Sequence, residues 1–242
     1  SIEHLHNATI YTPARFTHFN GIHMLLNLLL IVIAYLLGSI PSAVWIGRKF
    51  YGIDVREHGS HNAGATNTLR VLGPRAALPV FGIDILKGFV AVTLSHLTRY
   101  DDPAYIAQFG NDALFNLKIA LVAAAVIGHI LPIFANFKGG KGVATLTGAV
   151  LGVYPAAVLL CLVVFIIVFV STHYVSAGSM SAGIAFPIFV IGLFGERSLS
   201  LIIFSCLIAL LLLYTHRKNI RRLIDHTESK IYLRGNKNKQ PQ

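Results

Sequence analysis

A turn between two apolar segments carries two lysines and three glycines: Lys138, Gly139, Gly140, Lys141 and Gly142. Glycine has no side chain to keep a ligand away from the backbone, so the amide N–H groups of such a turn can face an anion. A helix that begins near Gly142 would also direct the positive end of its dipole into the turn. The pattern favours phosphate binding over the alternative, a basic turn that only marks the cytoplasmic side of a membrane protein.

A second polar stretch, residues 56–70, is rich in small hydrogen-bond donors and ends in an arginine. Hydroxyl and amide groups suit phosphate oxygens, and a guanidinium group can donate two parallel hydrogen bonds to one phosphate. The alternative is a solvated loop whose Ser, Asn and Gly residues make turns. The candidate ligands in this stretch are Ser60, Asn62, Thr66, Asn67 and Arg70.

A third candidate segment follows the last apolar run, where His216 and Asn219 stand among basic residues. Lys218 and Arg222 are typical of the cytoplasmic end of a transmembrane helix. His129 lies close to the glycine turn, where it is either a hydrogen-bonded packing residue or part of the site.

Asp84 and Lys87 stand inside an apolar segment, three residues apart. This spacing places them on one face of a helix, where they can form an ion pair. An ion pair in the membrane is costly unless it orders a site or a neighbouring loop. We expect a structural role, or a role behind the site, rather than direct catalysis.

The composition is that of an integral membrane protein. Of 242 residues, 55% are hydrophobic and 12% charged, and residues 142–195 contain no Asp, Glu, Lys or Arg. That stretch is long enough for two membrane crossings at about 20 residues each. The net charge of +10 does not call for a nucleic acid, because membrane proteins concentrate Lys and Arg on the cytoplasmic side.

Hydropathy predicts an all-α membrane protein with seven transmembrane helices, the fourth too short to span an ordinary bilayer. The basic residues gather in the first and third loops and in the tail, which places the amino terminus outside and the carboxyl terminus in the cytoplasm. Gly148 and Gly152 hint at close helix packing in the fourth segment. The predicted segments are 24–47, 77–98, 114–135, 142–152, 154–172, 175–195 and 198–214.

Three regions are expected along the chain. Residues 1–23 form a polar leader, either native or added for expression, residues 24–223 the membrane-embedded domain, and residues 224–242 a basic cytoplasmic tail. Cys161 and Cys206 lie in apolar runs, so we expect them to be small core residues. The spacing of a metal site, a Walker P-loop and a Gly-x-Ser-x-Gly nucleophile are all absent, so we expect neither a metal nor another cofactor.

These motifs resemble those of the bacterial acyl-phosphate:glycerol-3-phosphate acyltransferases, the PlsY family, from about residue 24 to residue 223. His61 departs from the family, which usually has glycine there. The resemblance rests on Gly-Ser-Ile-Pro-Ser at 38–42, Gly-Ser-His-Asn-Ala-Gly-Ala-Thr-Asn at 59–67 with Arg70, Asp84-x-x-Lys87-Gly88, Gly-His-x-x-Pro-x-Phe at 128–134 with Phe-Lys-Gly-Gly-Lys-Gly-Val-Ala-Thr at 137–145, and His-Arg-x-Asn-Ile at 216–220.

The resemblance implies a multi-pass enzyme of the bacterial inner membrane with its active site on the cytoplasmic side. It would transfer a fatty acyl group from acyl phosphate to the 1-position hydroxyl of glycerol 3-phosphate, giving lysophosphatidic acid and inorganic phosphate. Its partners would be these two substrates and membrane lipid, and we expect a monomer that binds no nucleic acid. The implied catalytic residues are Ser60, Arg70, Lys141, His216 and Asn219, and the implied phosphate-binding residues are Asn62, Thr66, Asn67, His129, Lys138, Gly139, Gly140, Gly142 and Thr145.

Acyl phosphate is already an activated mixed anhydride, so such an enzyme mainly has to position two anions and a hydroxyl and stabilise the departing phosphate. We expect the substrate's own phosphate to take the hydroxyl proton, with His216 orienting groups or acting as an auxiliary base. The main rival is a transporter or channel for a small anion such as phosphate, which would use the same basic turns and the broken fourth segment. A lipid phosphotransferase or phosphatase would need a metal or a nucleophile motif.

Overall fold

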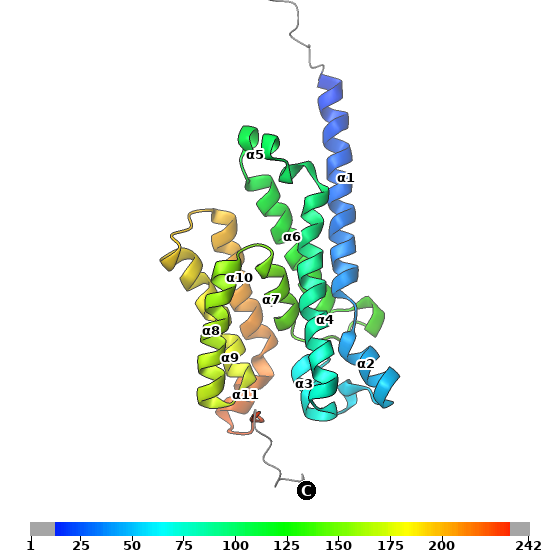
Figure 1. Ribbon diagram of the computed structural model, residues 1–242, viewed down its shortest axis with the longest axis vertical. Helices are drawn as coiled ribbons and strands as arrows, with labels where there is room; N and C mark the ends of the chain where they lie inside the picture. The colour runs from blue at the N-terminus through cyan, green and yellow to red at the C-terminus, as the bar shows by residue number, and fades with distance from the viewer. Residues whose placement is uncertain (1–12, 233–242) are drawn as a thin grey trace, which may run out of the picture.

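The computed structural model describes residues 13–232, which fold into helices joined by short connections, with no strand in that range (Figure 1). The α-helices are α1 (Pro13–Gly38), α2 (Ser42–Tyr51), α3 (Ala65–Leu72), α4 (Pro74–Thr93), α5 (Pro103–Phe109), α6 (Asp112–Ile130), α7 (Val143–Leu151), α8 (Pro155–Thr172), α9 (Val175–Pro187), α10 (Leu199–Thr215) and α11 (Arg217–Ile224). Short helical turns are η1 (Val55–Glu57), η2 (Leu94–Leu97), η3 (Arg99–Asp101), η4 (Ile133–Ala135) and the wider η5 (Ile188–Leu193).

Each apolar segment predicted from the sequence contains a helix in this structure, but the predicted segment 24–47 is broken between the end of α1 at Gly38 and the start of α2 at Ser42, and α6 ends at Ile130 within the predicted segment 114–135. Helix α7 has nine residues, as expected for the short fourth segment, and α1 begins at Pro13 rather than at the predicted residue 24. Within the described range, five helical stretches are long and apolar enough to cross a membrane, and α10 with α11 makes a sixth if this pair, bent by 58°, counts as one span. The all-helical membrane architecture is therefore confirmed, while seven crossings and the orientation stay predictions.

The helices form two groups (Figure 1). Helices α1, α4, α6 and α7 pack together in one group, and α8, α9 and α10 in the other. The α4–α7 contact is very close, because a Cβ on Gly88 or on Gly148 would lie 2.0 Å from a carbonyl oxygen of the opposite helix. Small residues let helix backbones approach in this way inside a membrane.

The connection between α6 and α7 reverses direction within a few residues. Pro132 follows the end of α6, and the backbone then takes left-handed conformations at Asn136, Phe137 and Gly142. Arg56 Nη1 donates to the carbonyl oxygen of Ala135 at 2.9 Å. This contact ties the polar stretch between α2 and α3 to the glycine-lysine turn.

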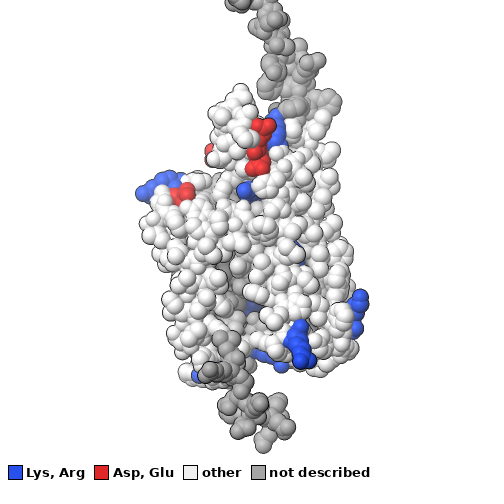
Figure 2. All heavy atoms as spheres, viewed as in Figure 1, with Lys and Arg blue, Asp and Glu red and all other residues white. Residues whose placement is uncertain are grey.

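A wide uncharged band covers the middle of the molecule, with charged side chains towards its two ends (Figure 2). On the face shown, acidic side chains appear only towards the end where α5 lies. Basic side chains appear towards both ends, including the end with α2 and α3. Large apolar side chains of α8 such as Leu159, Ile167 and Val170 are more than half exposed. Such a surface suits lipid, because exposed apolar patches of this extent are rare on soluble proteins.

Candidate active site

A cavity of about 220 Å³ lies between the two helix groups and extends from a polar end to an apolar end. We call it the interhelical cavity. Its polar lining includes Ser60, Asn62, Thr66, Asn67, Arg70, Asp84, His129, Lys141, Ser176, His216, Asn219 and Glu228. Its apolar lining includes Leu146, Val150, Val158, Leu162, Phe165, Phe186, Ile208 and Leu212. One continuous space thus offers hydrogen-bond donors at one end and hydrocarbon at the other.

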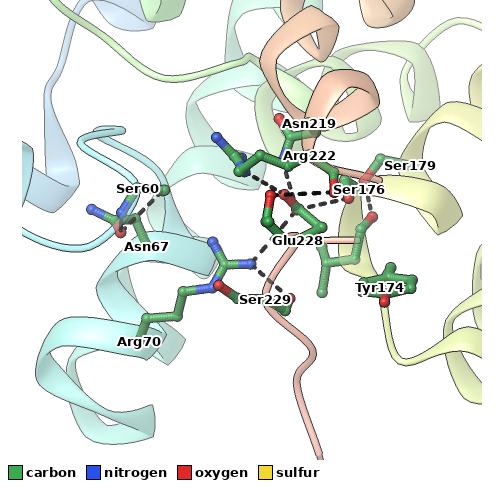
Figure 3. Close-up of polar contacts among 12 residues, drawn as sticks. Ser60, Asn67, Arg70, Tyr174, Ser176, Ser179, Asn219, Arg222, Glu228 and Ser229 are labelled. Carbon is green, nitrogen blue, oxygen red and sulfur yellow. Dashed lines mark hydrogen bonds and ion pairs between the residues drawn. The ribbon is translucent and has the colours of Figure 1, made fainter. Parts of the chain in front are cut away.

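A buried carboxylate organises the polar end (Figure 3). Glu228 Oε1 accepts from Asn219 Nδ2 at 2.7 Å and from Ser176 Oγ at 2.9 Å, and Oε2 accepts from Arg222 Nε at 2.6 Å. Arg70 Nη2 lies 3.9 Å from Oε1. Burial raises the pKa of this carboxyl, but the three hydrogen bonds outweigh it and hold the pKa below its usual range.

Lys141 also lines the polar end of the cavity, and the side-chain amide of Asn219 connects it to the Glu228 carboxylate. Its Nζ donates to Asn219 Oδ1 at 2.6 Å, and the other end of that amide donates to Glu228. Burial, opposed by Glu228 and assisted by the charges of Arg222 and Arg70, lowers the pKa of Lys141 to about 8. The ammonium group is therefore a partly desolvated cation, which binds an anion more strongly than a solvated one.

The polar stretch before α3 is held by an asparagine. Asn67 Oδ1 accepts from the Ser60 backbone N–H at 2.8 Å and from Ser60 Oγ at 3.0 Å. Asn67 Nδ2 donates to the carbonyl oxygens of Val55 and His58 at 2.7 and 3.1 Å. These bonds fix the Ser60 hydroxyl at the cavity wall, and Asn67 itself lies one helix turn before Arg70 on α3. The Arg70 guanidinium donates to the Ser229 carbonyl oxygen at 3.2 Å, and its buried Nε has no partner in the described structure.

His216 stands at the bend between α10 and α11 and is 2% exposed. Its Nδ1 lies 2.8 Å from the Leu212 carbonyl oxygen. A carbonyl can only accept, so Nδ1 carries the proton in this contact. In the neutral ring Nε2 is then the nitrogen left to accept a proton or a hydrogen bond at the cavity.

The start of α7 supplies backbone donors. Gly142 precedes the helix with φ 81°, and no side chain caps its first turn. The first N–H groups of a helix have no partner within it. Val143 and Ala144 line the cavity, so this end of α7 can bind an anion through its amides and its dipole.

The structure therefore brings together ten of the predicted residues, namely Ser60, Asn62, Thr66, Asn67, Arg70, His129, Lys141, Gly142, His216 and Asn219. Four others lie outside this cavity: Lys138, Gly139, Gly140 and Thr145. Lys138 is exposed. The N–H groups of Gly139 and Gly140 donate to the carbonyl oxygens of Ile130 and His129 at 3.2 Å, so they close the turn onto α6. Thr145 is buried behind the cavity against His129.

No group of three or more His, Cys, Asp or Glu side chains among the described residues could hold a metal ion. The cations of the polar end are side chains of Arg and Lys, which suit phosphate oxygens. The arrangement can position a phosphate-bearing molecule beside a hydroxyl, a neutral imidazole and a hydrocarbon channel.

The family model described as glycerol-3-phosphate acyltransferase matches residues 28–226 of this chain. The chain belongs to this glycerol-3-phosphate acyltransferase family. Proteins named glycerol-3-phosphate acyltransferase resemble it over most of their length: that of Salinibacter ruber is 41% identical (84% of this chain, 91% of the relative) and that of Fusobacterium nucleatum 42% identical (83% and 95%).

Two solved structures share the fold. Both are crystal structures of PlsY (YgiH), described as an integral membrane glycerol 3-phosphate acyltransferase and 35% identical to this chain. The glycerol 3-phosphate form has a TM-score of 0.73, and the match includes 96% of that structure's chain. The lysophosphatidic acid form has a TM-score of 0.70, and the match includes 95% of its chain. Both matches include 85% of the present chain.

The departure of this acyltransferase from the family pattern at His61 has a backbone explanation. His61 has φ 56°, a left-handed conformation that glycine adopts without steric cost. The exposed His61 ring lies with Nδ1 3.0 Å from the Arg56 carbonyl oxygen. The turn therefore keeps the shape that a glycine would give it.

Sequence reasoning missed three residues of the polar end. Ser176 lies in an apolar segment without other signals, and Arg222 looked like an ordinary basic residue at a helix end. Glu228 lies in the stretch predicted as a basic cytoplasmic tail, where its carboxylate follows a run of arginines and lysines. An acidic residue in a basic tail was the one available signal for an ion-pairing role.

Proposed function

We propose that this protein transfers a fatty acyl group from acyl phosphate to the 1-position hydroxyl of glycerol 3-phosphate, giving lysophosphatidic acid and inorganic phosphate. This is the first acylation of phospholipid biosynthesis. The observation that carries the proposal is the continuity of the interhelical cavity, which joins a cationic end to an apolar end. Both substrates carry a phosphate, and one of them also carries a hydrocarbon chain.

The bond changes balance with the groups available. The glycerol hydroxyl oxygen attacks the acyl carbonyl carbon, a new C–O ester bond forms, and the bond from that carbon to the phosphate oxygen breaks. The electron pair leaves with inorganic phosphate. The hydroxyl proton passes to a phosphate oxygen of the substrate, with His216 Nε2 as the auxiliary acceptor. Lys141, Arg70 and the amides at the start of α7 stabilise the negative charge on the departing phosphate.

The side chains around this reaction have distinct tasks. Asn219 joins Lys141 to the carboxylate network and so holds the ammonium group in place. On substrate binding, the Ser60 hydroxyl exchanges its bond to Asn67 Oδ1 for one to a substrate oxygen, while the Ser60 N–H keeps its bond to Asn67. The acyl chain lies along the apolar residues of α7, α8, α9 and α10, and it enters from the lipid.

The proposed placement in the cell follows from charge. Residues of α3 and α11 line the polar end of the cavity, and these two helices lie at the same end of the molecule (Figure 1). The basic loops and tail gather there, which assigns this end to the cytoplasm by the positive-inside rule. We propose a monomer of the bacterial inner membrane with seven crossings and an outside amino terminus, in which α7 is the short crossing and α10 the last.

The test uses purified protein in detergent. Phosphate is released from palmitoyl phosphate only when glycerol 3-phosphate is present, and lysophosphatidic acid appears in equal amount by mass spectrometry. Ser60→Ala, Arg70→Ala, Lys141→Ala and His216→Ala lower turnover steeply at unchanged expression.

Lys138→Ala is the matched control for Lys141→Ala, because Lys138 is an exposed lysine of the same turn outside the cavity. We expect near-normal turnover in this variant. Near-normal turnover in Lys141→Ala would contradict the phosphate role. Phosphate uptake into liposomes without acyl transfer would replace the proposal by an anion transporter.

A further inference from the structure

A buried charge cluster, of which Asp84 reaches the wall of the interhelical cavity, belongs to no step of the proposed reaction. Asp84 and Lys87 of α4 are 1% and 5% exposed. Their Oδ1 and Nζ atoms are 2.8 Å apart. Desolvating two charges is expensive, and an ion pair inside a membrane protein is a sign of function more than of stability.

The cluster joins the break between α1 and α2 to the rest of the fold. Ser42 Oγ donates to Asp84 Oδ1 at 2.8 Å, and Lys87 Nζ donates to the Ile40 carbonyl oxygen at 2.8 Å. On the opposite side, His129 Nδ1 of α6 lies 3.6 Å from the same Asp84 oxygen. One carboxylate thus connects three helices.

His129 carries these contacts on to the phosphate side. Its Nδ1 is 3.0 Å from Thr145 Oγ1 in the first turn of α7, and its carbonyl oxygen accepts from the Gly140 N–H at 3.2 Å. A Cβ on Gly140 would lie 2.2 Å from His129 Nε2, so the ring packs directly on the glycine-lysine turn. The orientation of this ring therefore fixes the segment that carries Lys141.

Asp84 and His129 also line a second cavity of about 10 Å³, between the α1–α2 break and the glycine turn, as well as the interhelical cavity itself. A space of this size has room for about one water molecule, and Ser42, Asp84 and Lys87 stand on its otherwise largely apolar wall. The cluster is therefore in contact with the site and is not isolated in the bundle.

We propose that Asp84 is a positioning residue that acts through His129. The carboxylate orients the imidazole, the imidazole holds the Gly140–Lys141 turn and the first turn of α7, and glycerol 3-phosphate affinity depends on this alignment. The inference rests on the proposed function of the site. A misplacement of about 1 Å in such a site can cost about a hundredfold in rate.

The test separates positioning from mere stabilisation by an ion pair. Asp84→Asn and Lys87→Met each leave one buried charge unpaired, so each lowers the melting temperature in detergent. The double variant Asp84→Asn/Lys87→Met has no unpaired charge and regains most of the lost stability. We expect its KM for glycerol 3-phosphate to stay raised about tenfold or more, with kcat changed less. Recovery of both stability and KM would overturn the proposal.

Thr145→Val tests the same path without touching a charge. It removes the hydroxyl contact to His129 and is expected to raise KM for glycerol 3-phosphate, whereas an unchanged KM would contradict the proposed path. Asp101→Asn is the control, because it alters a carboxylate contact with His96, neither residue of which lines the cavity, and should leave KM unchanged.

A binding measurement keeps this test independent of acyl transfer. Glycerol 3-phosphate, added without acyl donor, should raise the melting temperature of the wild-type protein at lower concentrations than it does for the double variant. If the wild type shows this stabilisation but no acyl transfer, the proposed function fails and the positioning role of Asp84 stands. Equal stabilisation of both proteins would refute the positioning role alone.

Discussion

Lys141 offers a test of the site, because its burial lowers its pKa and so sets an upper pH limit for substrate binding. The Nζ atom bonds Asn219 Oδ1 at 2.6 Å, and the pKa of Lys141 is lowered to about 8. The ammonium form, which we propose binds phosphate, therefore predominates below pH 8 and is lost above it. A hydrogen bond to a charged group contributes about 1.5–3 kcal/mol, so Lys141→Gln should lower kcat/KM for glycerol 3-phosphate between about tenfold and 150-fold at pH 7.

The pH profile of the wild type is the sharper assay. The dependence of kcat/KM reports groups of the free enzyme, so we expect it to fall by about tenfold per pH unit above pH 8. The second pKa of a phosphate monoester is about 6, so the substrate does not change charge in this range. In Lys141→Arg the cation cannot be deprotonated, and the alkaline limb should move out of the measurable range.

A flat profile of kcat/KM between about pH 7.5 and 9.5 in the wild type would refute this reasoning. If kcat/KM of Lys141→Arg fell above pH 8 as it does in the wild type, the titrating group would be another residue. Exposed Lys138 provides the comparison here too, because Lys138→Arg should leave the limb of the wild type in place.

Four further outcomes follow from the geometry. His61→Gly relieves a left-handed backbone that costs a non-glycine residue about 1 kcal/mol, so the melting temperature should not fall. Gly59→Ala should lower it, because the added Cβ would lie 2.5 Å from an asparagine side-chain oxygen. Gly88→Val places a side chain 2.0 Å from a carbonyl of α7, so we expect low yield of folded protein by size-exclusion chromatography. Asp54 is held by hydrogen bonds from an arginine that lower its pKa to about 2 although burial opposes them. Because the folded pKa is depressed, its stabilisation of about 2 kcal/mol is present above about pH 4 and lost as the pH falls through 2. Asp54→Asn should therefore be less stable than the wild type at pH 7 and nearly equal at pH 2, by chemical denaturation in detergent.

Much of the site could be predicted because polar residues are conspicuous in an apolar chain. Lys141, Arg70 and His216 each follow or interrupt an apolar run, and the positive-inside pattern places all three at one end of the molecule. The structure shows them around one cavity. The pairing of Asp84 with Lys87 also followed from spacing alone, since residues three apart share a helix face.

Other features depend on long-range contacts that local pattern does not contain. The amides of Gly139 and Gly140 looked free, but the turn folds back so that they bond to α6. Glu228 becomes buried only because the segment after α11 returns to Ser176 at the start of α9. The predicted segment 198–214 matches α10, but the bend of 58° between α10 and α11 at His216 was not predicted.

The polar end described above has an electrostatic consequence for turnover. Arg70, Lys141 and Arg222 contribute three positive charges and Glu228 one negative charge, which leaves an excess of two. A phosphate monoester near neutral pH carries close to two negative charges, so these side chains neutralise a single dianion. The two phosphate-bearing reactants of the proposed reaction together exceed that capacity, and the amides at the start of α7 would have to take up the remainder. Inorganic phosphate released in that reaction would compete for the same excess charge, so we expect accumulating product to slow the next round.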